Sequence, residues 1–73
     1  MSKLPRVSGQ ECVKALQRAG FEIKRQKGDH VFMQRRDPPA ITTVPQHREL
    51  DRGTLRAILN QAKLTVEEFT ELL

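Results

Sequence analysis

The side chains in this sequence best suited to proton transfer are its two histidines, His30 and His47. His30 follows Gly28 and Asp29, a pair typical of a tight hairpin turn, because glycine takes positive φ at no steric cost and aspartate tolerates it. A histidine at such a turn is partly open to water, and an imidazole with an unperturbed pKa of about 6.5 can both give and take a proton near neutral pH. We therefore interpret His30 as a candidate general acid or base, with a solvated surface histidine as the alternative.

Asp29 and His47 each allow two interpretations. Asp29 could orient the imidazole of His30 or act on it through its charge, but a role in shaping the turn explains it as well, and we favour the turn role. His47 lies in the loop after Pro45 and could be a second proton carrier, but a Pro-X-His loop before a helix is often structural, and we favour that role. Two histidines 17 residues apart with no cysteine cluster make a poor metal site, so we expect no metal and no cofactor.

Basic residues are concentrated around His30. Residues 1–36 carry nine Lys and Arg against three acids, whereas residues 37–73 carry four against six. Phosphate contacts dominate nucleic-acid affinity, so a polyanion would be drawn to the first half of the chain. The candidates for RNA binding are Lys24, Arg25, Lys27 and Arg35. Side chains alternate along a strand, so these four would be divided between two faces of a sheet and not all of them can serve.

Length and composition exclude several classes of protein. The 73 residues have room for a single domain, 1–73, with a small core. No apolar run is long enough for a transmembrane span, and the start of the sequence lacks the apolar segment of a secretion signal. Cys12 is the only cysteine, so no internal disulfide can form, and its place in a helical pattern predicts a small buried side chain. We expect a cytoplasmic protein that is a monomer when free.

Three helices are predicted from their caps and apolar faces. Ser8 and Glu11 have the spacing of a capping box, so a helix should run from about 9 to 19 and stop at Gly20. A second helix should begin at a cap at or near Asp51, and a second capping box at 65–68 should open a short third helix. The predicted apolar faces are, in chain order, Cys12, Val13, Leu16 and Ala19; Leu55, Ile58, Leu59 and Ala62; and Val66, Phe69, Leu72 and Leu73.

Three strands are predicted between the first two helices, at 21–26, 31–35 and 40–44. In the first strand Phe21 and Ile23 should face inward, while the apolar run 31–33 leaves open which face of the second strand packs on the helices. The order helix, three antiparallel strands, helix and short helix predicts an α+β domain, with the helices on one face of a three-stranded sheet. The other face would be open, and its basic residues would suit RNA.

The motifs of this sequence resemble those of the HicA family of bacterial toxins over nearly the whole chain. They are Ala19-Gly20-Phe21, then Gly28-Asp29-His30-Val31-Phe32, then Val44-Pro45-Gln46-His47-Arg48-Glu49-Leu50 leading into Gly53-Thr54-Leu55. The resemblance implies a fold similar to a double-stranded-RNA-binding domain. It also implies a type II toxin that cleaves mRNA without a metal, uses His30 as its catalytic histidine and is neutralised by a HicB-type antitoxin. The sequence departs from the family at Asp29, where serine is more usual, and at Lys63, where glycine is common.

A protein that cleaves RNA need not supply a nucleophile, because the 2′-hydroxyl of the substrate can serve as one. The protein must supply a base, a proton donor for the leaving oxygen and positive charge near the phosphate. His30 and the basic residues around it meet these needs. Two alternatives remain open: a non-catalytic module that holds double-stranded RNA, and an adaptor whose basic face docks an acidic protein.

Overall fold

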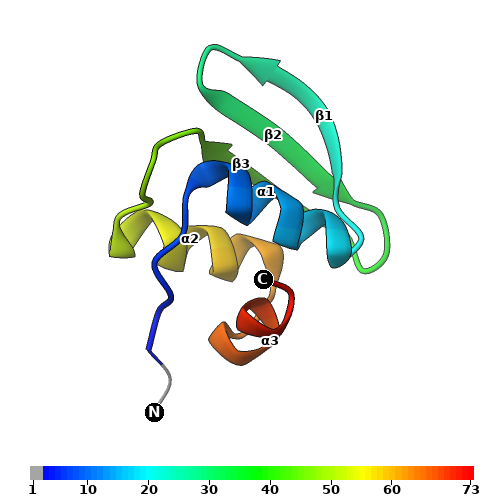
Figure 1. Ribbon diagram of the computed structural model, residues 1–73. Coiled ribbons are helices and arrows are strands. Elements are labelled where there is room, and N and C mark those ends of the chain that lie inside the picture. Colours follow the sequence, from blue (N-terminus) through cyan, green and yellow to red (C-terminus); the bar gives the residue numbers. More distant parts are fainter. Residues whose placement is uncertain (1–2) are drawn as a thin grey trace.

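The computed structural model describes residues 3–73 as a three-stranded sheet packed against helices (Figure 1). The chain order is α1 (Gly9–Arg18), β1 (Glu22–Lys27), β2 (His30–Arg35), β3 (Ala40–Pro45), α2 (Arg52–Ala62) and α3 (Val66–Glu71). The predicted α+β class and element order are therefore confirmed. Within the described residues, no helix has the length and apolar character needed to cross a membrane.

Each helix begins at a side-chain cap. Ser8 and Glu11 form the predicted capping box at the start of α1, and Thr65 and Glu68 form the second one at the start of α3. The Asp51 carboxylate caps α2, where it accepts a hydrogen bond from the backbone N–H of Thr54 at 2.7 Å. These caps satisfy backbone donors that a helix start otherwise leaves unpaired, so they fix where each helix begins.

The apolar faces of the helices form the core together with the inner face of the sheet. Cys12 and Leu16 of α1 and Phe69 of α3 are completely buried, as predicted. Leu73 was predicted to pack with them but is 47% exposed, because α3 ends at Glu71 and the last residue lies beyond the helix. The four predicted core residues of α2 are all buried: Leu55, Ile58, Leu59 and Ala62.

The three strands form an antiparallel sheet in the order β1-β2-β3. Val31 and Met33 of β2 and Val44 of β3 are buried against the helices, so the inner face of β2 is the one that carries Val31, Met33 and Arg35. His30, Phe32 and Gln34 alternate with those residues and therefore lie on the other, open face of the sheet. The sequence pattern left this choice undecided, and packing decides it.

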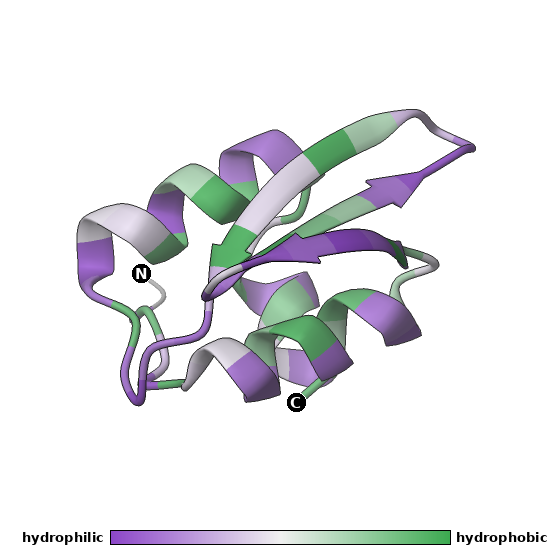
Figure 2. Ribbon diagram, turned by 90° about the horizontal axis from the view of Figure 1, so that it is seen from above, coloured by the Kyte–Doolittle hydropathy of each residue, from purple (hydrophilic) through white to green (hydrophobic). Residues whose placement is uncertain are grey.

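Strand β1 departs from the sequence-based expectation. All six of its residues are exposed, and Ile23, which was predicted to face inward, is 47% exposed. Figure 2 shows β1 as an almost wholly hydrophilic strand at one edge of the sheet. Ile23 pairs with Met33 of the inner face, so it points toward the helices as predicted, but it is not buried. The reason is that β1 is an edge strand that α1 leaves uncovered: an open groove of about 370 Å³ between them is lined in part by Val13, Gln17, Ile23 and Gln26.

Candidate active site at the β1–β2 turn

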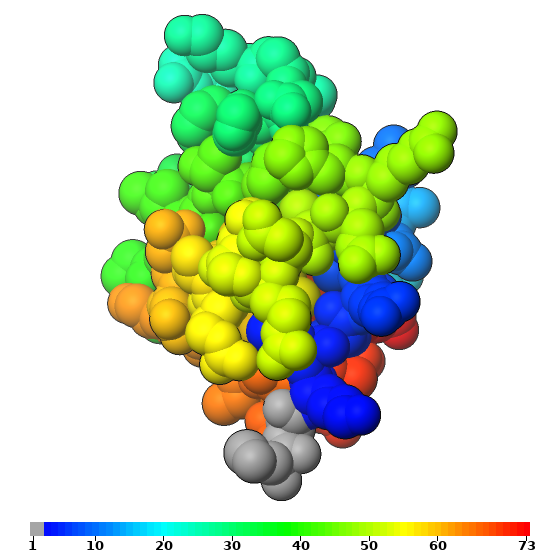
Figure 3. All heavy atoms as spheres, turned by 90° about the vertical axis from the view of Figure 1, so that its left-hand side faces the viewer, coloured from blue at the N-terminus to red at the C-terminus, as the bar shows by residue number. Residues whose placement is uncertain are grey.

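The turn between β1 and β2 places Asp29 and His30 at one end of the sheet. Gly28 takes the positive φ of 60° that this two-residue turn requires, and a Cβ there would meet no other atom within 4 Å. Since β2 and β3 are antiparallel, the start of β2 lies beside the end of β3, and His30 pairs with Pro45. Figure 3 shows the hairpin projecting from the molecule, with the segment that follows β3 directly beneath it.

The loop after β3 is held against this turn from two sides. The backbone N–H of Gln46 donates to the carbonyl of Asp29 at 2.6 Å. On the other side, the backbone N–H of Gly9, the first residue of α1, donates to the carbonyl of His47 at 2.9 Å. A Cβ on Gly9 would lie only 2.1 Å from the carbonyl oxygen of Pro45, so this close approach needs glycine. The position of His47 is thus fixed by backbone contacts to both α1 and the turn.

The carboxylate of Asp29 bridges the two histidines of the chain. His30 Nδ1 lies 3.0 Å from Asp29 Oδ1, and His47 Nε2 lies 3.3 Å from Asp29 Oδ2. All three side chains are between 54% and 58% exposed, so a ligand can reach them. Contacts this exposed add little to stability, so they matter chiefly for where they place the imidazoles.

The open face of the sheet carries basic and aromatic residues beside His30. Lys27 pairs with His30 across the hairpin, so the two are direct neighbours on this face. One step along the sheet, Arg25 pairs with Phe32, and its guanidinium carbon lies 4.7 Å from the centre of the phenyl ring. Two cations and one aromatic ring therefore lie next to His30 on a surface that no helix covers.

The other two predicted RNA-binding residues are placed differently. Lys24 lies where the β1–β2 register shifts, between Ile23 and Arg25, and its ammonium contacts the Glu22 carboxylate at 3.3 Å. Arg35 is only 9% exposed and faces the helices. Its guanidinium donates to the carbonyls of Pro38 and Ala62 at 2.9 and 3.1 Å and lies over the ring of Phe21. Arg35 is thus committed to contacts within the fold, which argues against the RNA-binding role predicted for it.

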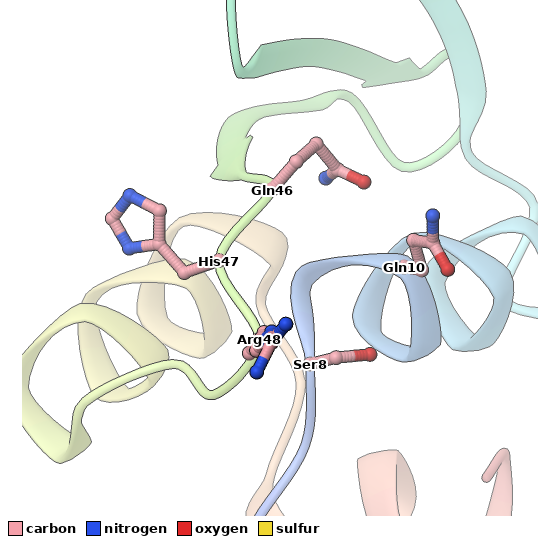
Figure 4. Close-up of a pocket in the computed structure, with 5 residues that line it drawn as sticks. All are labelled: Ser8, Gln10, Gln46, His47 and Arg48. Carbon is pink, nitrogen blue, oxygen red and sulfur yellow. The ribbon is translucent and has the colours of Figure 1, made fainter.

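A shallow pocket of about 450 Å³ adjoins the histidine loop and is lined by Ser8, Gln10, Gln46, His47 and Arg48. Figure 4 shows the side chain of Gln46 reaching toward Gln10, whereas the His47 ring points away from Gln10 and Ser8. The imidazole of His47 therefore faces away from this pocket, on the side where its Nε2 meets Asp29.

Asp51 and Cys12 have pKa values that are clearly shifted from those of the free side chains. The hydrogen bond from the Thr54 backbone lowers the pKa of Asp51 below its usual value, and electrostatic attraction to His47 contributes a smaller part. Burial raises the pKa of the Cys12 thiol to about 12, so this cysteine is a core residue with little thiolate character. Among residues 3–73, no group of three or more His, Cys, Asp or Glu is arranged to hold a metal ion.

The sequence interpretation did not anticipate the bridge between the histidines. We favoured a turn role for Asp29 and a structural role for His47 over their possible roles in orienting His30 and in carrying a second proton, and the structure shows that the same carboxylate contacts both imidazoles. The predicted strand order could have indicated this proximity. His30 begins β2 and His47 follows β3, and antiparallel pairing brings these two strand ends together. The catalytic roles of the three residues remain predictions.

Comparison with known proteins supplies a family for this arrangement. A search of curated proteins found no match to the chain. A family model described as the HicA toxin of bacterial toxin-antitoxin systems matches residues 9–64. The matched region runs from the first residue of α1 to just beyond α2 and includes the turn, the open sheet face and the histidine loop. Because it covers more than half of the sequence, the chain belongs to the HicA family of toxins from bacterial toxin–antitoxin systems.

Proposed function

We propose that this toxin is an mRNA endoribonuclease that needs no metal ion and uses His30 as a general acid or base. The observation that carries the proposal is the placement of His30. Its imidazole is 54% exposed at the edge of the open sheet face, is oriented by Asp29 and lies directly opposite Lys27. A histidine in such a position can exchange protons with a bound RNA, and general acid–base catalysis of this kind typically accelerates a reaction by about 10²–10⁴-fold.

The reaction follows from the chemistry of RNA. A base takes the proton of the 2′-hydroxyl, the 2′-oxygen forms a bond to the adjacent phosphorus, and the bond from phosphorus to the 5′-oxygen breaks as that oxygen gains a proton. The products are a 2′,3′-cyclic phosphate and a 5′-hydroxyl. Lys27 and Arg25 are placed to bind the phosphate and to stabilise the negative charge that develops on it, with Lys24 as a further contact along the strand.

Charge distribution and fold support RNA as the substrate. Arg25, Lys27, Phe32 and His30 share one uncovered face, on which the Arg25 guanidinium lies over the Phe32 ring. The order of elements is similar to that of a double-stranded-RNA-binding domain, as the family resemblance implies. As a member of a toxin–antitoxin family, the protein is expected to have an antitoxin partner, and we infer that a HicB-type antitoxin neutralises it. We further propose that the free toxin is a cytoplasmic monomer.

The direct test is cleavage of a long single-stranded RNA, with EDTA present, by the wild type and by His30→Ala. The wild type should cut and the variant should lose at least about 10²-fold in rate, while circular dichroism shows that both are folded. If the wild type binds the RNA without cutting it, the protein is the binding module of the alternative interpretation.

Phosphate binding is tested in the His30→Ala background, where RNA is not consumed. Lys27→Gln should weaken binding and make its dependence on salt concentration shallower by about 0.7 in the logarithmic slope for a single strand. Arg56→Gln is the matched control, because Arg56 is an exposed cation of α2 away from the open sheet face. Equal effects of the two substitutions would contradict the assignment of the open face as the RNA surface.

A further inference from the structure

The two histidines meet the Asp29 carboxylate through different ring nitrogens. His30 uses Nδ1, which lies 3.0 Å from Oδ1, whereas His47 uses Nε2, which lies 3.3 Å from Oδ2. The negative charge of an ionised carboxylate favours the tautomer whose N–H is on the nearer ring nitrogen, because it would repel the electron pair of an unprotonated nitrogen there. In a neutral ring the remaining nitrogen then holds the free electron pair. His30 therefore presents Nε2 as its free nitrogen, and His47 presents Nδ1.

We propose that Asp29 is a positioning residue that holds His30 and His47 in opposite tautomers, and that His47 is the second proton carrier of RNA cleavage. This inference rests on the proposed function and adds two residues to it. Two observations support it. The backbone hydrogen bonds from Gly9 to His47 and from Gln46 to Asp29 hold the His47 loop in place, and both imidazole rings are more than half exposed.

The charges around the two rings suggest how the roles divide. His30 faces the Asp29 carboxylate within its own turn, the Lys27 ammonium across the hairpin and the uncharged Pro45 on β3. His47 faces Asp29 from the turn and is within electrostatic reach of Asp51 at the start of α2. Two carboxylates suit the ring that carries the extra proton, so we assign the acid to His47 and the base to His30.

The proton balance of this pair is complete. His30 Nε2 takes the proton of the 2′-hydroxyl as the 2′-oxygen attacks phosphorus, and protonated His47 gives the proton on Nδ1 to the departing 5′-oxygen. At the end His30 carries the extra proton and His47 is neutral. Hydrolysis of the cyclic phosphate with the roles reversed, or exchange with solvent, restores the starting state.

The tautomers can be measured without any RNA. Long-range ¹H–¹⁵N NMR of the imidazoles in their neutral form reports which nitrogen carries each proton. The wild type should show the Nδ1–H form for His30 and the Nε2–H form for His47. In Asp29→Asn the amide offers one acceptor and one donor, so at least one histidine should change tautomer. Asp37→Asn is the matched control, since it removes a carboxylate from the turn at the opposite end of β2.

Activity tests the second proton carrier. A base and an acid acting together give a rate that falls at both low and high pH. His47→Gln leaves the backbone bond from Gly9 in place, and it should lower kcat by about 10²-fold with little change in KM. It should also remove the fall at high pH, because that fall reports loss of the acid. If His47 had only a structural role, His47→Gln would instead lower the midpoint of unfolding, and the rate would still fall at both low and high pH.

The outcomes separate this inference from the proposed function. His30 in the Nε2–H form in the wild type would overturn the positioning role of Asp29, whatever the activity. If His47→Gln cuts as fast as the wild type while His30→Ala does not cut, the second proton carrier is refuted and the proposed function stands. If the wild type itself cuts no RNA, the proposed function and the catalytic pair are both wrong.

Discussion

Replacing Gly9 with alanine should show how closely α1 is fitted to the loop that carries His47. The new Cβ would lie 2.1 Å from the carbonyl oxygen of Pro45 and 2.8 Å from the Cα of Gln46, and both are backbone atoms that cannot turn aside. Overpacking of this kind typically costs about 1–3 kcal/mol, and a weakened hydrogen bond from Gly9 to His47 would add about 1 kcal/mol. The higher helix propensity of alanine offsets up to about 1 kcal/mol of this destabilisation.

The net expectation for Gly9→Ala is a loss of roughly 1–3 kcal/mol in the free energy of unfolding. A domain of this size has about 4–11 kcal/mol in total, so the variant should still fold, with a Tm lowered by roughly 10 °C. Urea unfolding and thermal unfolding followed by circular dichroism measure both quantities.

Gly53 provides the matched control for Gly9. It also lies in the first turn of a helix, but its nearest neighbour for an added Cβ is Asp51 Oδ1 at 3.7 Å, which is ordinary contact. Gly53→Ala should therefore be neutral or stabilising by up to about 1 kcal/mol. Equal stability of Gly9→Ala and Gly53→Ala would refute the reasoning that α1 and the histidine loop are in forced contact.

Three further predictions concern stability and reactivity. Lys63 ends α2 with a left-handed φ of 61°, so Lys63→Gly should raise the free energy of unfolding by roughly 0.5–1 kcal/mol in urea titrations. The substitution also removes the exposed hydrogen bond from the Lys63 ammonium to the Pro39 carbonyl, which reduces this gain. The pKa of Asp51 is lower in the folded state, so its contribution to stability is present above the usual carboxyl pKa and is lost as pH falls through the lowered value. Urea unfolding at neutral and acid pH should therefore show that acidification lowers the free energy of unfolding less in Asp51→Asn than in the wild type. With a pKa of about 12, only about one part in ten thousand of Cys12 is thiolate at pH 8, so a thiol reagent should label the folded protein far more slowly than the urea-unfolded chain.

Much of the fold could be predicted from local patterns. The spacing of Leu55, Ile58, Leu59 and Ala62 indicated the buried face of α2, and two capping boxes indicated where α1 and α3 begin. These signals are local because they depend on helical periodicity and on hydrogen bonds between residues three positions apart. The hairpin turn was predictable for the same reason, since Gly28 supplies a backbone conformation that other residues rarely adopt.

The features that failed depend on packing between distant segments. Ile23 does face the helix side, but whether α1 covers β1 there, and so buries Ile23, is a property of the assembled layers. Arg35 looked like an RNA contact, but it lies on the inner face and satisfies the carbonyl of Ala62, 27 residues away, at the end of α2. The bridge from Asp29 to His47 likewise needs the β2–β3 pairing and the backbone bond that Asp29 accepts from Gln46.

The measurement that tests the central claim most directly is the chemistry of the ends left on a cleaved RNA. The wild-type toxin should be incubated in EDTA with an RNA and with the same sequence carrying 2′-O-methyl groups, and the product termini should be analysed. Attack by the 2′-hydroxyl, with His30 as the base, predicts 2′,3′-cyclic phosphate and 5′-hydroxyl ends from the RNA and no cutting of the methylated strand. Ends bearing a 5′-phosphate, or equal cutting of both strands, would contradict the account, because water rather than the substrate's own hydroxyl would then be the nucleophile.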